Sequence, residues 1–212
     1  MAGSIMRFVL PRHRNRLTLS HLACRLAHSE RGVAAIEFAF VLPVMLLVYF
    51  GVVEVAQGVM IDRKVSQLNR ALADLTSQAK AGSLPTADRD SIFEAAQMIM
   101  APYTGKPKMM IASIVVDNSS IAKVCWSEAK NTTALARGTT VTLPEGLRIA
   151  NSSVIMAQAS YSFTPTVGYV LSGAIEIGGS KIYMRPRVGK SGGSPTVEQI
   201  ERAGVAMCPG FN

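Results

Sequence analysis

The sequence predicts an α+β protein with an N-terminal transmembrane helix that continues into an amphipathic helix, followed by a small extracytoplasmic domain of helices packed on an antiparallel sheet. Three observations predict this fold class. A charge-free apolar run lies near the N-terminus, a helical stripe of apolar residues follows it, and short strand-forming runs bounded by turn residues fill most of the remainder. A chain of 212 residues has room for one modest domain besides a membrane segment.

The apolar run covers residues 38–53 and contains no charged side chain. Sixteen helical residues span about 24 Å, which is less than a hydrocarbon core of about 30 Å, so apolar residues on both sides must extend the helix. We therefore predict a transmembrane helix over residues 33–61. Within it, Pro43 removes one backbone donor and Glu54 is placed near the membrane interface. A buried core helix is the weaker alternative, because it would need protein on every side.

The charge distribution predicts the orientation of this helix. Residues 1–32 carry six arginines and one acid, +5 of the total net charge of +8, whereas the charges after the span are of mixed sign. By the positive-inside rule, residues 1–32 form a basic cytoplasmic leader and residues 62–190 an extracytoplasmic domain, with residues 191–212 as a linker and tail. Because the positive charge is confined to this leader, no nucleic-acid partner is predicted. A cleaved secretory signal is the competing interpretation, but Glu54 would stand where such a cleavage site needs a small residue.

An acidic residue interrupts the apolar sequence just before the charge-free run, in the order Gly32-Val33-Ala34-Ala35-Ile36-Glu37-Phe38. A carboxylate in an apolar membrane segment is costly, so Glu37 is expected to have a partner and a function. The alternative interpretation is an interfacial glutamate whose side chain reaches the lipid headgroups.

Residues 31–72 resemble the opening of the TadE/TadF-like family of the tight adherence (Flp-type) pilus assembly system. The shared positions are Glu37, Phe38, Ala39, Val41, Leu42, Pro43 and Gly51. A looser resemblance to a later pattern of the family involves Tyr161, Phe163, Pro165, Met184, Arg185 and Arg187. The long leader and the tail after Lys190 depart from the family pattern.

This resemblance implies cleavage by a prepilin peptidase after Gly32, a new N-terminus at Val33, and a Glu37 that pairs with the positive amino terminus of its own or a neighbouring subunit. It further implies a minor pilin or pseudopilin-like component of the bacterial inner membrane. The partners it implies are membrane lipid, other pilus assembly proteins or pilins, and a prepilin peptidase. A signal-anchored envelope module for binding or sensing, unrelated to pili, is the alternative function.

The residues after the span predict the elements of the outer domain. An apolar stripe at helical spacing continues the helix to about residue 78 and packs either on its own domain or on partner helices; its members are Ile61, Val65, Leu68, Leu72, Leu75 and Ala79. Further elements are expected from local patterns: a helix at 86–100, strands at 109–116, 122–127, 139–143, 153–163 and 181–185, a short helix at 167–171, a flexible linker at 190–195 and a short helix within 196–212.

The three cysteines leave two interpretations open. Outside the cytoplasm, Cys125 and Cys208 would share an oxidising compartment that excludes Cys24, so they can form a disulfide, or Cys125 can be a buried thiol and Cys208 a free one. All three histidines lie in the leader, and no catalytic motif or metal-ligand spacing occurs. We therefore predict no enzyme, no catalytic residue, no metal site, no cofactor and no small-molecule substrate.

Overall fold

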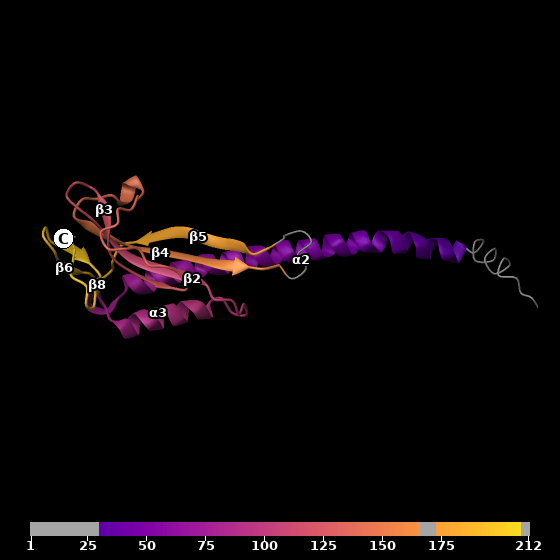
Figure 1. Cartoon of the computed structure of the whole chain (residues 1–212), viewed down its shortest axis with the longest axis horizontal. Helices are drawn as coiled ribbons and strands as arrows, with labels where there is room; N and C mark the ends of the chain where they lie inside the picture. The colour runs from indigo at the N-terminus through magenta and orange to yellow at the C-terminus, as the bar shows by residue number, and fades with distance from the viewer. Residues whose placement is uncertain (1–29, 166–172, 209–212) are drawn as a thin grey trace, which may run out of the picture. The chain divides into compact units, whose positions relative to one another are not determined.

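The structure is a computed structural model that describes residues 30–165 and 173–208 of the chain. The chain divides into two compact units, Met1–Tyr49 and Phe50–Asn212. The described part of the first unit is helical throughout, and all of the β structure belongs to the second. Figure 1 shows the sheet of the second unit beside the C-terminal part of the long helix α2.

Helix α2 (Glu30–Ser77) continues without interruption from the apolar run into the amphipathic segment. In the second unit its inward face carries Ile61, Val65, Leu68 and Leu72, each exposing 2 % of its surface or less. These side chains join the core formed with the sheet and with α3 (Thr86–Met98). The stripe therefore packs on its own domain, one of the two alternatives that the sequence left open.

The end of the stripe differs from its prediction. Leu75 is 39 % exposed, and Thr76 takes the buried position beside Ala73. A repeat of 3.5 residues drifts by about 20° per heptad on an α-helix of 3.6 residues per turn, so a stripe with alternating spacings of 3 and 4 turns away from the core after two heptads.

A short connection of η1 (Lys80–Gly82) and β1 (Ser83–Leu84) joins α2 to α3. Pro85 begins α3 in an extended conformation, and the helix ends at Met98, two residues before the predicted end. Beyond that end, Lys64 Nζ on α2 donates hydrogen bonds to the carbonyl oxygens of Ile99 (3.1 Å) and Ala101 (2.7 Å). A cation at the C-terminal carbonyls of a helix is favourable, and here it also ties the two helices together.

The main sheet is antiparallel, with the strand order β3-β2-β4-β5. Its strands are β2 (Lys108–Val116), β3 (Ala122–Lys130), β4 (Ser152–Phe163) and β5 (Ile175–Met184). Because side chains alternate along a strand, odd-numbered residues of β2 and β4 such as Ile111 and Ile155 face α2 and α3, while even-numbered ones such as Ile114 and Met156 form a second core.

The second core lies under residues 131–151, a segment that contains η2 (Glu145–Leu147) and contributes Val141 and Leu143. The predicted strand at residues 139–143 is wrong, since the segment makes only an isolated bridge between Thr140 and Lys123. Gly138 at φ 81° and Pro144 bound this segment, and its apolar side chains Val141 and Leu143 cover the sheet from a loop.

Strand β5 is longer than predicted, because it begins at Ile175 rather than at residue 181. Two adjacent glycines, Gly178 and Gly179, resemble a turn in sequence but lie inside the strand beside a register shift between Gln158 and Ser160. Gly178 has φ +94°, and a Cβ there would overlap the side chain of Val65 on α2. The glycine therefore allows the strand to approach the helix closely.

The C-terminal predictions need correction. The expected linker at 190–195 and the helix within 196–212 are wrong for the described residues, which form β6 (Lys190–Gly192) paired with β7 (Val197–Gln199), and β8 (Glu201–Arg202) parallel to β1. The expected helix at 167–171 lies outside the described residues. The fold class itself is confirmed: an apolar N-terminal helix, a second helix and antiparallel sheets make an α+β chain. The domain boundaries at residues 32, 61 and 190 stay predictions.

Candidate functional site

The first candidate site is the apolar part of α2, whose side chains are exposed. Phe40 is 78 % exposed and Val44 62 %. The most apolar window of this helix has a mean hydropathy of 2.3, and none of it is buried inside the protein. Leaving so many large apolar side chains in water is unfavourable by about 25 cal/mol for each Å². Among residues 30–165 and 173–208, α2 is the one helix that is long and apolar enough to cross a membrane, which indicates single-pass anchoring.

The residues of the predicted processing motif all lie in the first turns of α2. Gly32 and Val33 follow its first two residues, and Glu37 is exposed one turn after Val33 on the same face. A cut after Gly32 would leave a helix that begins with an ammonium group, four residues from a carboxylate. Their opposite charges could pair within one chain or between neighbouring chains.

Three further positions of this helix were singled out in the sequence. Pro43 lies inside the helix, where it cannot donate to the carbonyl of Ala39. Gly51 is half-buried in the second unit. Glu54 is only 2 % exposed, although the next residue, Val55, is 51 % exposed. The domain therefore shields the carboxylate of Glu54 while the opposite side of the same helical turn is uncovered.

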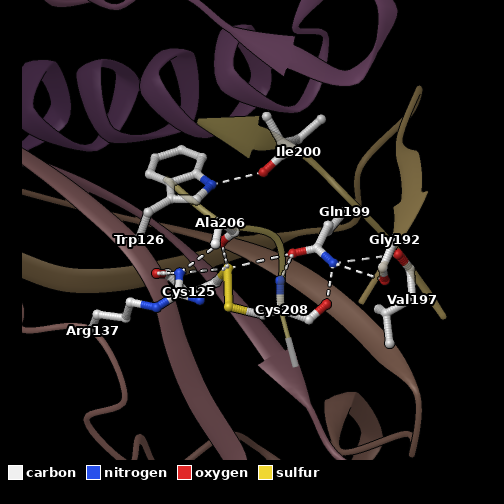
Figure 2. Close-up of a disulfide and its surroundings, with 9 residues drawn as sticks. All are labelled: Cys125, Trp126, Arg137, Gly192, Val197, Gln199, Ile200, Ala206 and Cys208. Carbon is white, nitrogen blue, oxygen red and sulfur yellow. Dashed lines mark hydrogen bonds between the residues drawn. A yellow bond between two sulfur atoms is a disulfide. The ribbon is translucent and has the colours of Figure 1, made fainter. Parts of the chain in front are cut away.

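The second candidate site is a disulfide within the second unit of the chain (Figure 2). Cys125 on β3 and Cys208 near the C-terminus are bonded across a sequence separation of 83 residues, with their Cα atoms 5.8 Å apart. The register of β3 against β2 shifts at this point: Trp126 pairs with Ser113 and Val124 pairs with Ile114, so Cys125 is an extra, bulged residue. The bulge places two consecutive side chains, Cys125 and Trp126, in the same core.

Side-chain hydrogen bonds hold the C-terminal segment around the disulfide (Figure 2). Gln199, which has no exposed surface, accepts from the backbone N–H of Cys208 (3.0 Å) and donates to the carbonyls of Cys208 and Gly192. The indole N–H of Trp126 donates to the carbonyl of Ile200 (2.7 Å). Arg137 Nη1 donates to the carbonyls of Cys125 (2.9 Å) and Ala206 (2.8 Å). No sequence pattern indicates Gln199 or Arg137, because their partners are backbone groups that only the folded chain brings into reach.

An ionic network fixes the neighbouring strand β8. Arg202 Nε donates to Glu128 Oε1 (2.7 Å), and Arg89 Nη1 donates to Glu128 Oε2 (2.9 Å). Arg202 is 7 % exposed and also donates to the Leu84 carbonyl (3.2 Å). Burial acts to raise the pKa of Glu128, but the hydrogen bonds and charges of Arg202 and Arg89 outweigh it, so the net pKa lies below the ordinary value. The carboxylate is therefore ionised and joins β3, α3 and β8.

The described residues offer little for catalysis. Within residues 30–165 and 173–208, no three His, Cys, Asp or Glu side chains lie close enough together to hold a metal ion. A hollow of about 570 Å³ beside Tyr103 and Tyr161 is an open groove, and none of its lining residues carries a charge.

Comparison with known proteins agrees with the resemblance seen in the sequence. Residues 32–73, about a fifth of the chain, match the family model described as TadE-like protein. No curated protein and no solved structure matches the chain significantly. The TadE-like assignment of this segment is thereby confirmed, while the looser resemblance around residues 161–187 lies outside the match. A TadE-like segment indicates a membrane-associated component of a Tad pilus system, a structural family rather than a known enzyme family.

Proposed function

We propose that this chain, with its TadE-like residues 32–73, is a minor pilin or pseudopilin-like membrane component of a Flp/Tad pilus assembly and secretion machine. One observation carries the proposal: the matched segment coincides with an exposed apolar helix that has Gly32 and Glu37 at its start. The protein acts without catalysis, through helix–helix contacts in the membrane and domain contacts outside it. Its partners are membrane lipid and other pilus assembly proteins or pilins.

The proposed location is the bacterial inner membrane, with the N-terminus in the cytoplasm and the domain in the periplasm or outside the cell. The six arginines before the span support this orientation. The disulfide between Cys125 and Cys208 supports it independently, because structural disulfides form in oxidising compartments and are rare in the cytosol.

The processing motif is proposed as the substrate of a prepilin peptidase that cuts after Gly32. The new ammonium of Val33 would then pair with Glu37 of its own chain or of a neighbouring subunit, which would offset the cost of placing that carboxylate in lipid. A wrong register between neighbouring helices would leave both charges unpaired, so the pair would also align subunits.

The N-terminal sequence of the protein recovered from its host membrane tests this proposal. We expect the chain to start at Val33. A start at Met1 would reject processing and favour a plain signal-anchored binding or sensing module, and a start beyond Gly51 would reject membrane anchoring.

A pair of variants tests the role of the carboxylate. Glu37→Leu should reduce the recovery of crosslinked pilus partners, while Glu94→Leu, which removes an exposed carboxylate on α3, should leave it unchanged. Equal recovery from both variants and the wild type would show that Glu37 has no part in assembly.

A further inference from the structure

The outer boundary of the bilayer falls within the second unit of the chain. Residues 38–53 cover about 24 Å, so a helix that crosses a hydrocarbon core of about 30 Å needs about four more residues. Toward the N-terminus, Glu37 is tolerated in lipid only when it is paired, whereas toward the C-terminus exposed apolar side chains continue to Met60, which is 54 % exposed. Extension past Val53 meets Glu54, but the domain shields that carboxylate, and the next apolar side chains are uncovered: Val55 is 51 % exposed and Val59 48 %. Lipid therefore reaches the turn of α2 that contains Gln57.

An open groove lies at the same turn of the helix. It is bounded by Gln57 of α2, by residues 102–105 between α3 and β2, and by the last residues of β4. Tyr103 and Tyr161 lie in its wall, with ring centroids 6.3 Å apart. Tyrosine has an apolar ring and a polar hydroxyl, and it is enriched where membrane and water meet. Thr104 and Ser162 add exposed hydroxyl groups.

The loop that forms this groove is fixed to the domain. Lys64 Nζ on α2 binds the carbonyls of Ile99 and Ala101 at its start, and the N–H of Tyr103 donates to the Met100 carbonyl (2.9 Å). At its end, the N–H of Gly105 donates to the hydroxyl oxygen of Tyr161 (3.2 Å). The loop is therefore already ordered, and it loses little conformational entropy when it contacts a surface.

The chemistry of the loop fits phospholipid headgroups. No acidic residue lines the groove, and Lys106, which directly follows it in the loop, is exposed. A lysine ammonium at a membrane surface gains about 1 kcal/mol from anionic lipid. Hydroxyl groups and a lysine can donate to phosphate and ester oxygens, while the apolar part of Tyr103 meets the upper ends of the acyl chains.

We propose that loop 101–106 and its groove rest on the outer headgroup layer of the bilayer and bind phospholipid headgroups there. This gives the outer domain a membrane contact of its own, in addition to the helix that anchors it. The inference depends on the membrane anchoring of the proposed function, so its test must separate the two.

Tryptophan fluorescence in vesicles of phosphatidylethanolamine and phosphatidylglycerol with brominated acyl chains provides that test. Bromine quenches only a nearby indole, and the wild type has one tryptophan, Trp126, which is buried in the domain. Three variants of the full chain each add one indole at an exposed position: Thr104→Trp in the loop, Ile121→Trp in the turn after β2, and Leu46→Trp in the apolar helix. Ile121 lies beyond the far end of β2, a nine-residue strand of about 30 Å, and is the matched control.

The proposal predicts that bromine close to the headgroups removes most of the emission added by Thr104→Trp and none of that added by Ile121→Trp. Leu46→Trp should be quenched most by bromine deep in the chains. If Leu46→Trp is quenched but Thr104→Trp behaves like Ile121→Trp, the headgroup contact is wrong and the anchoring stands. If Leu46→Trp is not quenched, the anchoring fails and the contact fails with it. Lys106→Trp, at a second exposed position of the loop, repeats the measurement should Thr104→Trp not fold.

Discussion

Among single residues, Glu128 joins several separate segments through its side chain. Its two carboxylate oxygens bind arginines from α3 and β8, and Arg202 in turn reaches the backbone between α2 and α3. Arg202 is nearly buried, so removing its counter-charge leaves a guanidinium with poor access to water. The network therefore stabilises the C-terminal strand only while Glu128 is ionised.

We predict that Glu128→Gln lowers the free energy of unfolding by about 1–3 kcal/mol near neutral pH, the usual range for a lost charged hydrogen bond. The folded pKa of Glu128 lies below its unfolded value, about 4.3. The carboxylate therefore adds stability above that value and loses it as the pH falls through the folded pKa. The difference between variant and wild type should shrink in acid, as measured by chemical unfolding at several pH values.

A matched control for this prediction is Glu145→Gln, because the side chain of Glu145 is 94 % exposed and faces Arg148 at 3.6 Å. An exposed pair of this kind is expected to change stability by less than about 0.5 kcal/mol at any pH. A Glu128→Gln effect as small as that of the control would contradict a structural role for the network.

The geometry of single residues also explains why the sequence alone did not decide whether Cys125 and Cys208 form a disulfide. Alternation along β3 puts consecutive side chains on opposite faces of the sheet, and only the bulge brings Cys125 and Trp126 to one side. A bulge depends on pairing with a partner strand, so the local sequence does not predict it. The TadE-like motif, in contrast, could be recognised because all of its residues lie within one continuous helix.

At the scale of elements, α2 shows how a periodic pattern positions a helix on its domain. Leu68 is fully buried against the sheet, and Leu75, two turns later, is 39 % exposed. Both leucines have the spacing of the predicted stripe, so the sequence pattern alone predicts that both are buried. The structure distinguishes them because the 3.5-residue spacing drifts around the helix.

This difference predicts unequal costs for the same substitution. Leu68→Ala should lower the free energy of unfolding by about 2–5 kcal/mol, as expected for a cavity in a core, and Leu75→Ala by less than about 1 kcal/mol. Denaturant unfolding of the full chain in detergent, followed by the emission of Trp126, measures both. Equal losses would mean that α2 is rotated about its axis, with Leu75 turned toward the core.

The other elements could be predicted to different degrees. The strands at 108–116 and 152–163 have long runs of apolar and β-branched residues, and their boundaries were predicted to within one residue. Segments rich in glycine were predicted wrongly, because both Gly178 and Gly192 lie in strands and not in turns. At Gly178, the close approach of other residues leaves no room for a side chain. In such places tertiary contact overrides local turn propensity.

On the scale of the whole molecule, the disulfide joins the end of the described chain to β3, an edge strand of the main sheet. It closes a loop with a sequence separation of 83 residues, which restricts the unfolded chain strongly. Replacing both Cys125 and Cys208 by serine should therefore lower the free energy of unfolding by about 2–5 kcal/mol. Chemical unfolding of the full chain, monitored by Trp126, measures the loss.

Cys24→Ser is the control for that prediction, since Cys24 lies in the sequence predicted to be a leader and is not a partner in the disulfide. It should leave the unfolding curve unchanged. A double serine variant as stable as this control would mean that the hydrogen bonds of Gln199 and Trp126 alone hold the C-terminal segment.

One face of the main sheet is covered by the helices, and residues 131–151 cover the part of the other face that holds the second core. Backbone hydrogen bonds from Gly138 and Val141 also cover part of the outer edge of β3. The remaining edge strand, β5, contains two adjacent glycines at positive φ, Gly178 and Gly179, a distortion that discourages a further strand from pairing. The main sheet therefore offers little free edge for pairing with the sheet of a second copy of the chain. If copies assemble as the proposed function requires, their contacts would come from helices and loops rather than from a continuous β-ribbon.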